Sequence, residues 1–128
     1  MGLDAWFFAR MDYREKALRI KDQSLEFVWL PVKDAALGAF SQAYNISEQQ
    51  IYTQMLYHHY SAPPGYCFDM LCSDDRIVSD KNLLTFNLVN KVDDLMDYFL
   101  NVSKAFRTEH ILIPFGEDFN YQDAHEYY

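Results

Sequence analysis

The stretch AWFFARMDYREKALRIKDQSLEFVWLP, residues 5–31, decides the fold that the sequence predicts. It opens with a short apolar run typical of a strand and continues with mixed charges at helical spacing. It closes with a second apolar run that ends at Pro31. A strand, an exposed connecting helix and a second strand in this order form a β-α-β signature.

A second helix is predicted in NKVDDLMDYFLNVSKAFR, residues 90–107, where apolar side chains repeat at helical spacing. The apolar HILIPFG, residues 110–116, follows without alternation, as expected of a strand buried on both faces of a parallel sheet. We therefore expect an α/β fold, with a mostly parallel sheet or a β/α barrel and covering helices, incomplete at both ends. Residues 35–60 fit a helix or a strand, and the breaker-rich residues 61–90 indicate a loop.

Composition narrows the class of protein. The chain has 128 residues, of which 50% are hydrophobic and 17% aromatic, so one packed core is expected. Its net charge of -8 repels phosphate backbones and argues against nucleic acid as a partner. The longest apolar runs are far shorter than the roughly 20 residues that a membrane span needs, so no span is expected.

Both ends of the sequence suggest a part of something larger. The first apolar run begins almost at Met1, with no turn before it. The last residues, YQDAHEYY, look like the first turn of a helix that stops before it has buried anything. We expect residues 1–128 to be the central part of one α/β domain, truncated at both termini.

Two adjacent carboxylates, Glu117 and Asp118, follow the predicted strand at 110–116, and Arg10 ends the first strand. Binding and catalytic residues gather at the carboxyl ends of strands in such sheets. A carboxylate there can act as a general acid or base, bind a cation, or cap the next helix. The residues alone leave these interpretations open.

Five segments resemble the catalytic domain of glycoside hydrolase family 38. They are FFARMDYREK, LEFVW, YSAPPGYCFDMLC, VDDLMDYFLNVS and PFGEDFNYQDA, in this order, and they span essentially the whole chain. Tyr60 precedes Cys67 by seven positions, as in the family, and the run Cys-Phe-Asp-Met-Leu-Cys is similar to the family's Cys-Trp-Asp-Val-Leu-Cys. Any one motif would be weak evidence, whereas five at matching distances are specific.

The resemblance implies a fragment of a retaining exo-α-mannosidase that hydrolyses terminal α-linked mannose from N-glycan oligosaccharides. Asp118 matches the general acid/base of the family's Gly-x-Asp-Phe motif. Arg10 matches a substrate-pocket arginine, with a structural ion pair as the alternative, and Tyr60 matches a tyrosine beside the bound sugar, with aromatic packing as the alternative. Glu117 is expected to be a modulator or a surface residue, whose charge helps to keep Asp118 protonated.

The resemblance also implies a zinc ion in the full-length enzyme. The family binds it through a His-x-Asp pair, the nucleophilic Asp and a downstream His, and none of these motifs occurs in this sequence. On an extended chain the adjacent His58 and His59 point to opposite faces and cannot easily share one metal ion, so we expect them to be surface or loop residues. The remainder of the mannosidase chain is thus the expected source of the nucleophile and the zinc ligands. The alternative is a non-enzymatic carbohydrate-binding protein or an inactive shortened relative.

Cys67 and Cys72 have four residues between them, a spacing that allows a small disulfide loop. The resemblance implies that they are bonded, and two buried thiols are the alternative. Asn45 and Asn101 each begin an Asn-x-Ser sequon and are candidate glycosylation sites. Together these features favour the lysosome or the lumen of the secretory pathway.

We predict that the 128-residue chain by itself has no detectable mannosidase activity, because it carries the expected acid/base without the nucleophile or the zinc ligands. The test is incubation of the purified chain with an aryl α-mannoside and zinc, followed by measurement of the released phenol. Turnover by the chain would contradict the assignment of those groups to another part of the enzyme.

Overall fold

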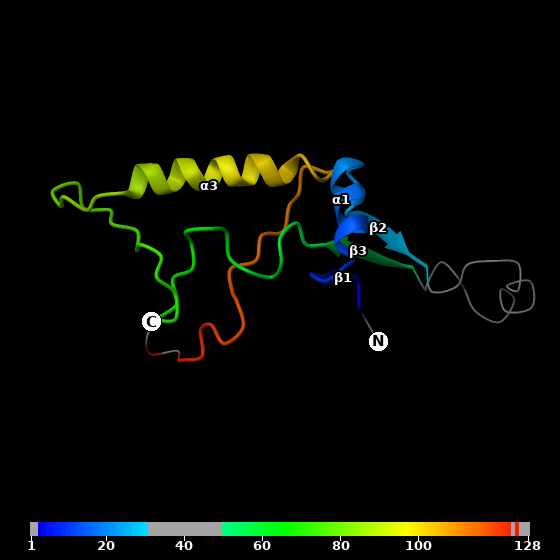
Figure 1. Ribbon diagram of the computed structural model, residues 1–128, viewed down its shortest axis with the longest axis horizontal. Helices are drawn as coiled ribbons and strands as arrows, with labels where there is room; N and C mark the ends of the chain where they lie inside the picture. Colours follow the sequence, from blue (N-terminus) through cyan, green and yellow to red (C-terminus); the bar gives the residue numbers. More distant parts are fainter. Residues whose placement is uncertain (1–2, 31–49, 124, 126–128) are drawn as a thin grey trace, which may run out of the picture.

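A computed structural model describes residues 3–30, 50–123 and 125 (Figure 1). In chain order they form β1 (Ala5–Phe8), α1 (Tyr13–Lys21), β2 (Glu26–Trp29), β3 (Ile51–Met55) and α3 (Leu88–Ser103). The strand-helix-strand order predicted from residues 5–31 and the helix predicted in 90–107 are confirmed. Residues 61–87 form turns and bends, as predicted. Of the ambiguous stretch, 51–55 is a strand, and 35–49 lies outside the described residues.

The mostly parallel sheet or β/α barrel predicted from the sequence is wrong. The strands form one small mixed sheet in the order β1-β3-β2, in which β1 runs parallel to β3 and β2 runs antiparallel to it. The later strand β3 therefore separates the two strands that α1 connects. Chain order alone does not reveal such an insertion, because any strand that arrives later can pair between two earlier ones.

The strand predicted at 110–116 does not form either, since these residues adopt no helix or strand. Ile111 and Ile113 are partly buried against the core, and Pro114 has no backbone N–H to donate to a ladder. A short apolar run predicts burial, but side-chain packing alone can supply that burial. The prediction failed because it took burial as evidence of strand pairing.

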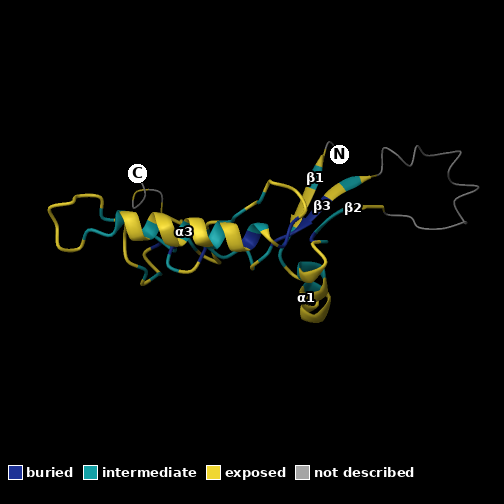
Figure 2. Ribbon diagram, turned by 90° about the horizontal axis from the view of Figure 1, so that it is seen from above, coloured by how far each residue is buried: buried dark blue, intermediate teal, exposed yellow. Residues whose placement is uncertain are grey.

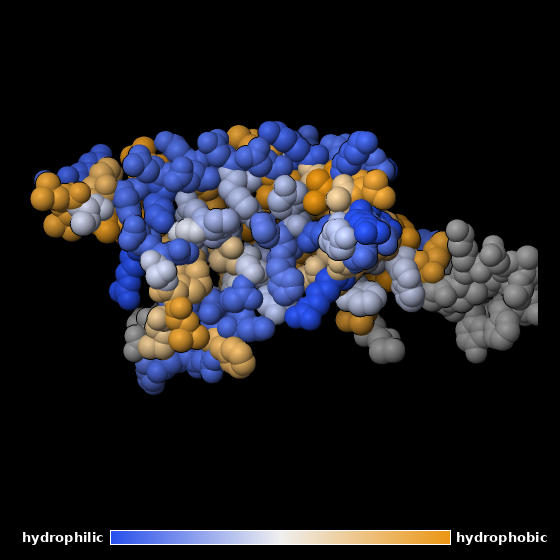
Figure 3. Space-filling view, in the orientation of Figure 1, coloured by the Kyte–Doolittle hydropathy of each residue, from blue (hydrophilic) through white to orange (hydrophobic). Residues whose placement is uncertain are grey.

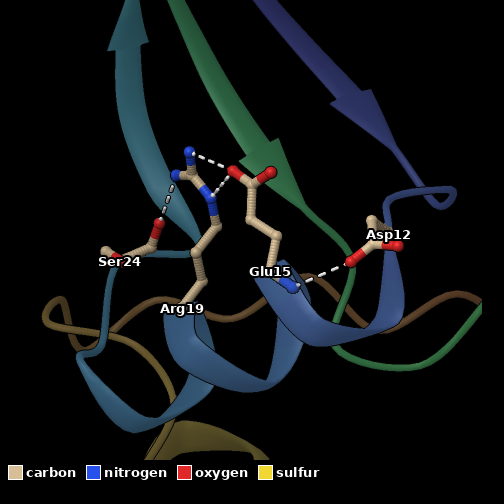
Figure 4. Close-up of polar contacts among 4 residues, drawn as sticks. All are labelled: Asp12, Glu15, Arg19 and Ser24. Carbon is tan, nitrogen blue, oxygen red and sulfur yellow. Dashed lines mark hydrogen bonds and ion pairs between the residues drawn. The ribbon is translucent and has the colours of Figure 1, made fainter.

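Polar contacts of Asp12, at the N-terminus of helix α1, and of Arg19, in its last turn, stabilise this helix (Figure 4). The Asp12 side chain caps the helix by accepting hydrogen bonds from the backbone N–H of Arg14 at 3.0 Å and of Glu15 at 3.3 Å. Arg19 pairs with Glu15 at 2.8 Å and donates to the Ser24 carbonyl at 3.0 Å. None of the residues of α1 is fully buried, although Ile20 packs against the core, so these polar contacts help to attach the helix to the start of β2.

The core is small and lies where the end of α3 meets the sheet. Its buried residues are Leu25, Met55, Val102, Ala105 and Phe106, and Figure 2 shows this junction as the buried part of the ribbon. Along α3 the predicted apolar face is only partly covered, since Val92 and Met96 are 49% and 51% exposed. In Figure 3 the apolar surface is scattered over the visible face. The core therefore packs against Tyr57 in the segment that follows β3, but it leaves most of α3 exposed to solvent.

We predict that Gly65→Ala lowers the free energy of unfolding by about 1 kcal/mol, because Gly65 has a φ of +84°, where a Cβ is strained. Urea denaturation of the purified chain measures this change. Gly116→Ala is the matched control, since an added Cβ there meets nothing within 4 Å. Equal destabilisation by the two substitutions would contradict the prediction.

Candidate active site

The parallel pair β1 and β3 brings two of the predicted site residues to one edge of the sheet. Arg10 follows β1 and Tyr60 follows β3, so both leave the sheet at the carboxyl ends of neighbouring strands. Backbone bonds continue this pairing past the strands, since the N–H of Leu56 donates to the Phe8 carbonyl at 2.9 Å. The paired strands β1 and β3 thus place Arg10 and Tyr60 at the same end of the sheet.

Asp118 reaches this edge through a contact between two irregular segments, 60–62 and 116–118. The Tyr60 hydroxyl donates to Asp118 Oδ1 at 2.8 Å, and the Ser61 hydroxyl donates to the Glu117 carboxylate. The backbone N–H of Ala62 donates to the Gly116 carbonyl at 2.9 Å. The two segments therefore run antiparallel and are linked residue by residue, although Tyr60 and Asp118 are 58 positions apart in the sequence.

The electrostatics of Tyr60 reflect both of its charged neighbours. Its hydrogen bond to the Asp118 carboxylate raises the pKa of Tyr60 above the ordinary value of a phenol, because the carboxylate disfavours a second negative charge. Arg10 acts on the same hydroxyl and works in the opposite direction. Arg10, Tyr60 and Asp118 thus form one electrostatically linked cluster.

The Asp118 side chain is exposed, so a ligand can reach a carboxyl group whose orientation is set by Tyr60. A carboxyl group held in this way can donate a proton to a bound molecule and later accept one. Glu117 is exposed as well, and its carboxylate is engaged by Ser61. The two adjacent carboxylates therefore have different partners.

The turn that follows Asp118 is strained. The backbone N–H of Asn120 donates to the Glu117 carbonyl at 3.1 Å, and within this turn Phe119 has a φ of +67°. Tyr121 has a φ of +57°. Such conformations cost about 1–3 kcal/mol each for residues other than glycine, and they persist only where the surroundings fix them. Strain of this kind is common at functional sites.

Two residues beside Tyr60 were missed as site residues in the sequence. The ring of His59 contacts the Tyr60 ring with centroids 3.8 Å apart. Both histidines lie outside helices and strands, with His58 exposed and His59 half-buried. Ser61, which donates a hydrogen bond to Glu117, gave no signal beyond its place next to Tyr60. The Ser61 contact could not be predicted, because it depends on which distant segment arrives, whereas the adjacency of His59 and Tyr60 in the sequence was a signal that could have been used.

The remaining predicted residues lie elsewhere. Cys67 and Cys72 form a disulfide, with their Cα atoms 5.8 Å apart. Asn101 is exposed on α3, and its side-chain oxygen accepts a hydrogen bond from Lys104 Nζ at 2.9 Å. Asn45 lies outside the described residues.

A metal centre is absent from the described part of the chain. Within residues 3–30, 50–123 and 125, no three His, Cys, Asp or Glu side chains are grouped so that they could hold a metal ion. These residues therefore do not fit a zinc site of their own.

Neither described helix is long and apolar enough to cross a membrane.

Comparison with known families identifies the class of protein to which the chain belongs. The model of the glycosyl hydrolases family 38 N-terminal domain matches residues 1–128. Because the match covers the entire sequence, the chain belongs to this family.

Individual relatives are similar over the same length. The lysosomal alpha-mannosidase of Bos taurus is 32% identical over 132 aligned residues, which are 100% of this chain and 12% of the relative. The lysosomal alpha-mannosidase of Dictyostelium discoideum is 31% identical, covering 100% of the chain and 11% of the relative. The alpha-mannosidase of Canavalia ensiformis is 30% identical, covering 100% and 12%. The chain therefore spans about one eighth of the length of these relatives.

We predict that Asp118→Asn lowers the pKa of Tyr60 towards that of an ordinary phenol, because it removes the negative charge that opposes the phenolate. Titration of the tyrosine ¹³Cζ resonances by NMR measures the pKa. Glu117→Gln is the control, since it removes an adjacent charge that binds Ser61 instead. An unchanged Tyr60 pKa in Asp118→Asn would show that the contact does not exist in solution.

Proposed function

We propose that residues 1–128 are the central part of a catalytic domain and supply the acid/base side of the active site of a retaining exo-α-mannosidase. Its substrates are N-glycan oligosaccharides with terminal α-linked mannose. The observation that carries the proposal is the 2.8 Å hydrogen bond from Tyr60 to Asp118 in a family 38 domain. The names of the relatives, which are alpha-mannosidases, support the choice of substrate.

Asp118 is the general acid/base in this proposal. Retaining glycosidases use two carboxyl groups about 5 Å apart, one as nucleophile and one as acid and then base. Asp118 gives its proton to the departing glycosidic oxygen while the nucleophile attacks the sugar. In the second step it takes a proton from the water that releases the mannose.

Tyr60 and Arg10 act as substrate-binding and orienting residues around Asp118. The Tyr60 hydroxyl fixes the rotation of the Asp118 carboxyl group, so that the proton faces the leaving oxygen when a sugar is bound. The Arg10 guanidinium is always charged and donates hydrogen bonds to substrate oxygens and to the nucleophile beside them.

The nucleophile and the zinc ion are assigned to the remainder of the mannosidase chain. The described residues offer no group of side chains that could hold the ion. In the full-length enzyme the zinc would hold sugar hydroxyls, and Asp118 would approach the same sugar from its leaving-group side.

The lysosome or the lumen of the secretory pathway is the proposed location. The Cys67–Cys72 disulfide is compatible with an oxidising compartment. Asn101 is exposed and can accept a glycan without disturbing the core. Two of the relatives cited above carry the name lysosomal alpha-mannosidase.

The test is a chimera in which this chain replaces the aligned segment of the Bos taurus enzyme. We expect turnover of aryl α-mannosides, and we expect Asp118→Ala to lower kcat/KM for a poor leaving group by about 10²–10⁴-fold. The loss of kcat/KM is smaller for a dinitrophenyl mannoside, because that leaving group needs no proton and kcat/KM does not include the second step. Release of phenol at substrate concentrations well below KM measures kcat/KM for both substrates.

Glu117→Ala in the same chimera is the matched control, and it is expected to cost much less. Equal slowing of both substrates by Asp118→Ala would argue against the acid role. A secreted, folded chimera that binds mannosides without hydrolysing them would favour the alternative, a carbohydrate-binding or inactive relative.

A further inference from the structure

We propose that Asp69 is a positioning residue for Asp118. It lies in the disulfide loop between Cys67 and Cys72 and holds the backbone of the turn that follows the acid/base. The kinetic consequence of this inference rests on the proposed function, whereas the tether itself does not.

Asp69 is a buried carboxylate with backbone partners on two different segments. Its side chain belongs to a residue that is 5% exposed, and it is the one buried Asp or Glu among residues 3–30, 50–123 and 125. Oδ1 accepts the N–H of Leu71 at 2.8 Å, and Oδ2 accepts the N–H of Tyr121 at 2.7 Å. A buried charge is costly unless hydrogen bonds satisfy it, so both bonds are needed where they are.

The loop that carries Asp69 is itself fixed. The disulfide closes it, and the N–H of Cys72 donates to the Asp69 carbonyl at 2.9 Å. The N–H of Cys67 donates to the Asp74 carboxylate at 2.9 Å. Asp69 is therefore attached to a small braced loop, and its carboxylate is an anchor with little freedom to move.

The other end of the tether is the strained turn after Asp118. The backbone N–H of Tyr121 donates to Asp69. Tyr121 and Phe119 both have a left-handed φ. Asn120, between them, donates its side-chain amide to Cys67 Sγ at 3.3 Å. Two contacts to the disulfide loop thus hold the residues just after Asp118 in conformations that they would otherwise leave.

These contacts complete the support of the acid/base. Tyr60 fixes the carboxyl group of Asp118 from one side, and Asp69 fixes the chain on the other. If the turn relaxes, the proton of Asp118 loses its alignment with the leaving oxygen. The reactions that depend on that proton must then slow most.

Asp69→Asn tests the tether, because an amide keeps the shape of the side chain but has a single acceptor oxygen. The local turn to Leu71 keeps that oxygen, so the hydrogen bond from the Tyr121 backbone N–H to Asp69 is lost. Asp74→Asn is the matched control: it makes the same change in charge on a residue that binds the same loop but not the turn.

In the 128-residue chain we expect Asp69→Asn to speed hydrogen exchange at the Tyr121 amide by at least about tenfold, and Asp74→Asn to leave it nearly unchanged. NMR measures this exchange without any catalysis. Unchanged exchange at Tyr121 in Asp69→Asn would overturn the tether. An inactive chimera would overturn the proposed function instead.

In the active chimera we expect Asp69→Asn to lower kcat/KM for a poor leaving group about tenfold more than for a dinitrophenyl mannoside, and to have no further effect on kcat/KM in an Asp118→Ala background. Equal slowing of both substrates, or an added loss in that background, would overturn the positioning role. If Asp69→Asn does not fold, Asn120→Ala removes the second contact and must show the same selectivity to a smaller degree, and equal slowing by it would likewise overturn the role.

Discussion

The pairing of residues 60–62 with 116–118 is the constraint on which the site depends. Neither segment belongs to a helix or strand, so no repetitive ladder holds them together. Three successive links do so, and a single hydrogen bond contributes only about 0.5–1.5 kcal/mol net. The three hydrogen bonds act together, because each one keeps the two segments in register for the other two. Without this pairing, nothing would bring Tyr60 and Asp118 together, and the Asp118 carboxyl group would lose the hydrogen bond that orients it.

The two sides of this pairing have different foundations. Tyr60 follows β3, whose last residue, Met55, belongs to the buried core. Asp118 follows an irregular segment in which Ile111 and Ile113 are only partly buried against that core, and the turn after it is held by polar contacts to the disulfide loop. This turn keeps its geometry only while the buried Asp69 keeps its hydrogen bonds, because an unsatisfied buried group costs more than a satisfied one contributes. The position of Asp118 thus depends largely on directional bonds.

Local patterns predicted local structure well and pairing poorly. The apolar runs at 5–8 and 26–29 are strands, and the charged stretch between them is a helix with an Asp12 cap. The run at 110–116 is buried in part without being a strand, and the antiparallel entry of β2 had no signature at all. Periodicity reports which side chains avoid water, and it is silent about which neighbour covers them. Ser61 and Asp69 escaped notice for the same reason, since Glu117 and Tyr121, with which they form hydrogen bonds, are distant in the chain.

The sequence by itself determined the strands at 5–8 and 26–29 and both described helices, because each follows from residue types at fixed spacing. It also determined the family, through a resemblance in five segments, and this resemblance implied the cysteine pair and the candidates Arg10, Tyr60 and Asp118. Only the tertiary structure decided that β3 lies between β1 and β2, and that Asp118 meets Tyr60 across 58 positions. It alone decided that the buried Asp69 accepts a hydrogen bond from Tyr121 in the strained turn that follows Asp118. The physical reason is that hydrogen-bond partners remote in sequence are selected by the free energy of the entire packed chain, which no local pattern contains.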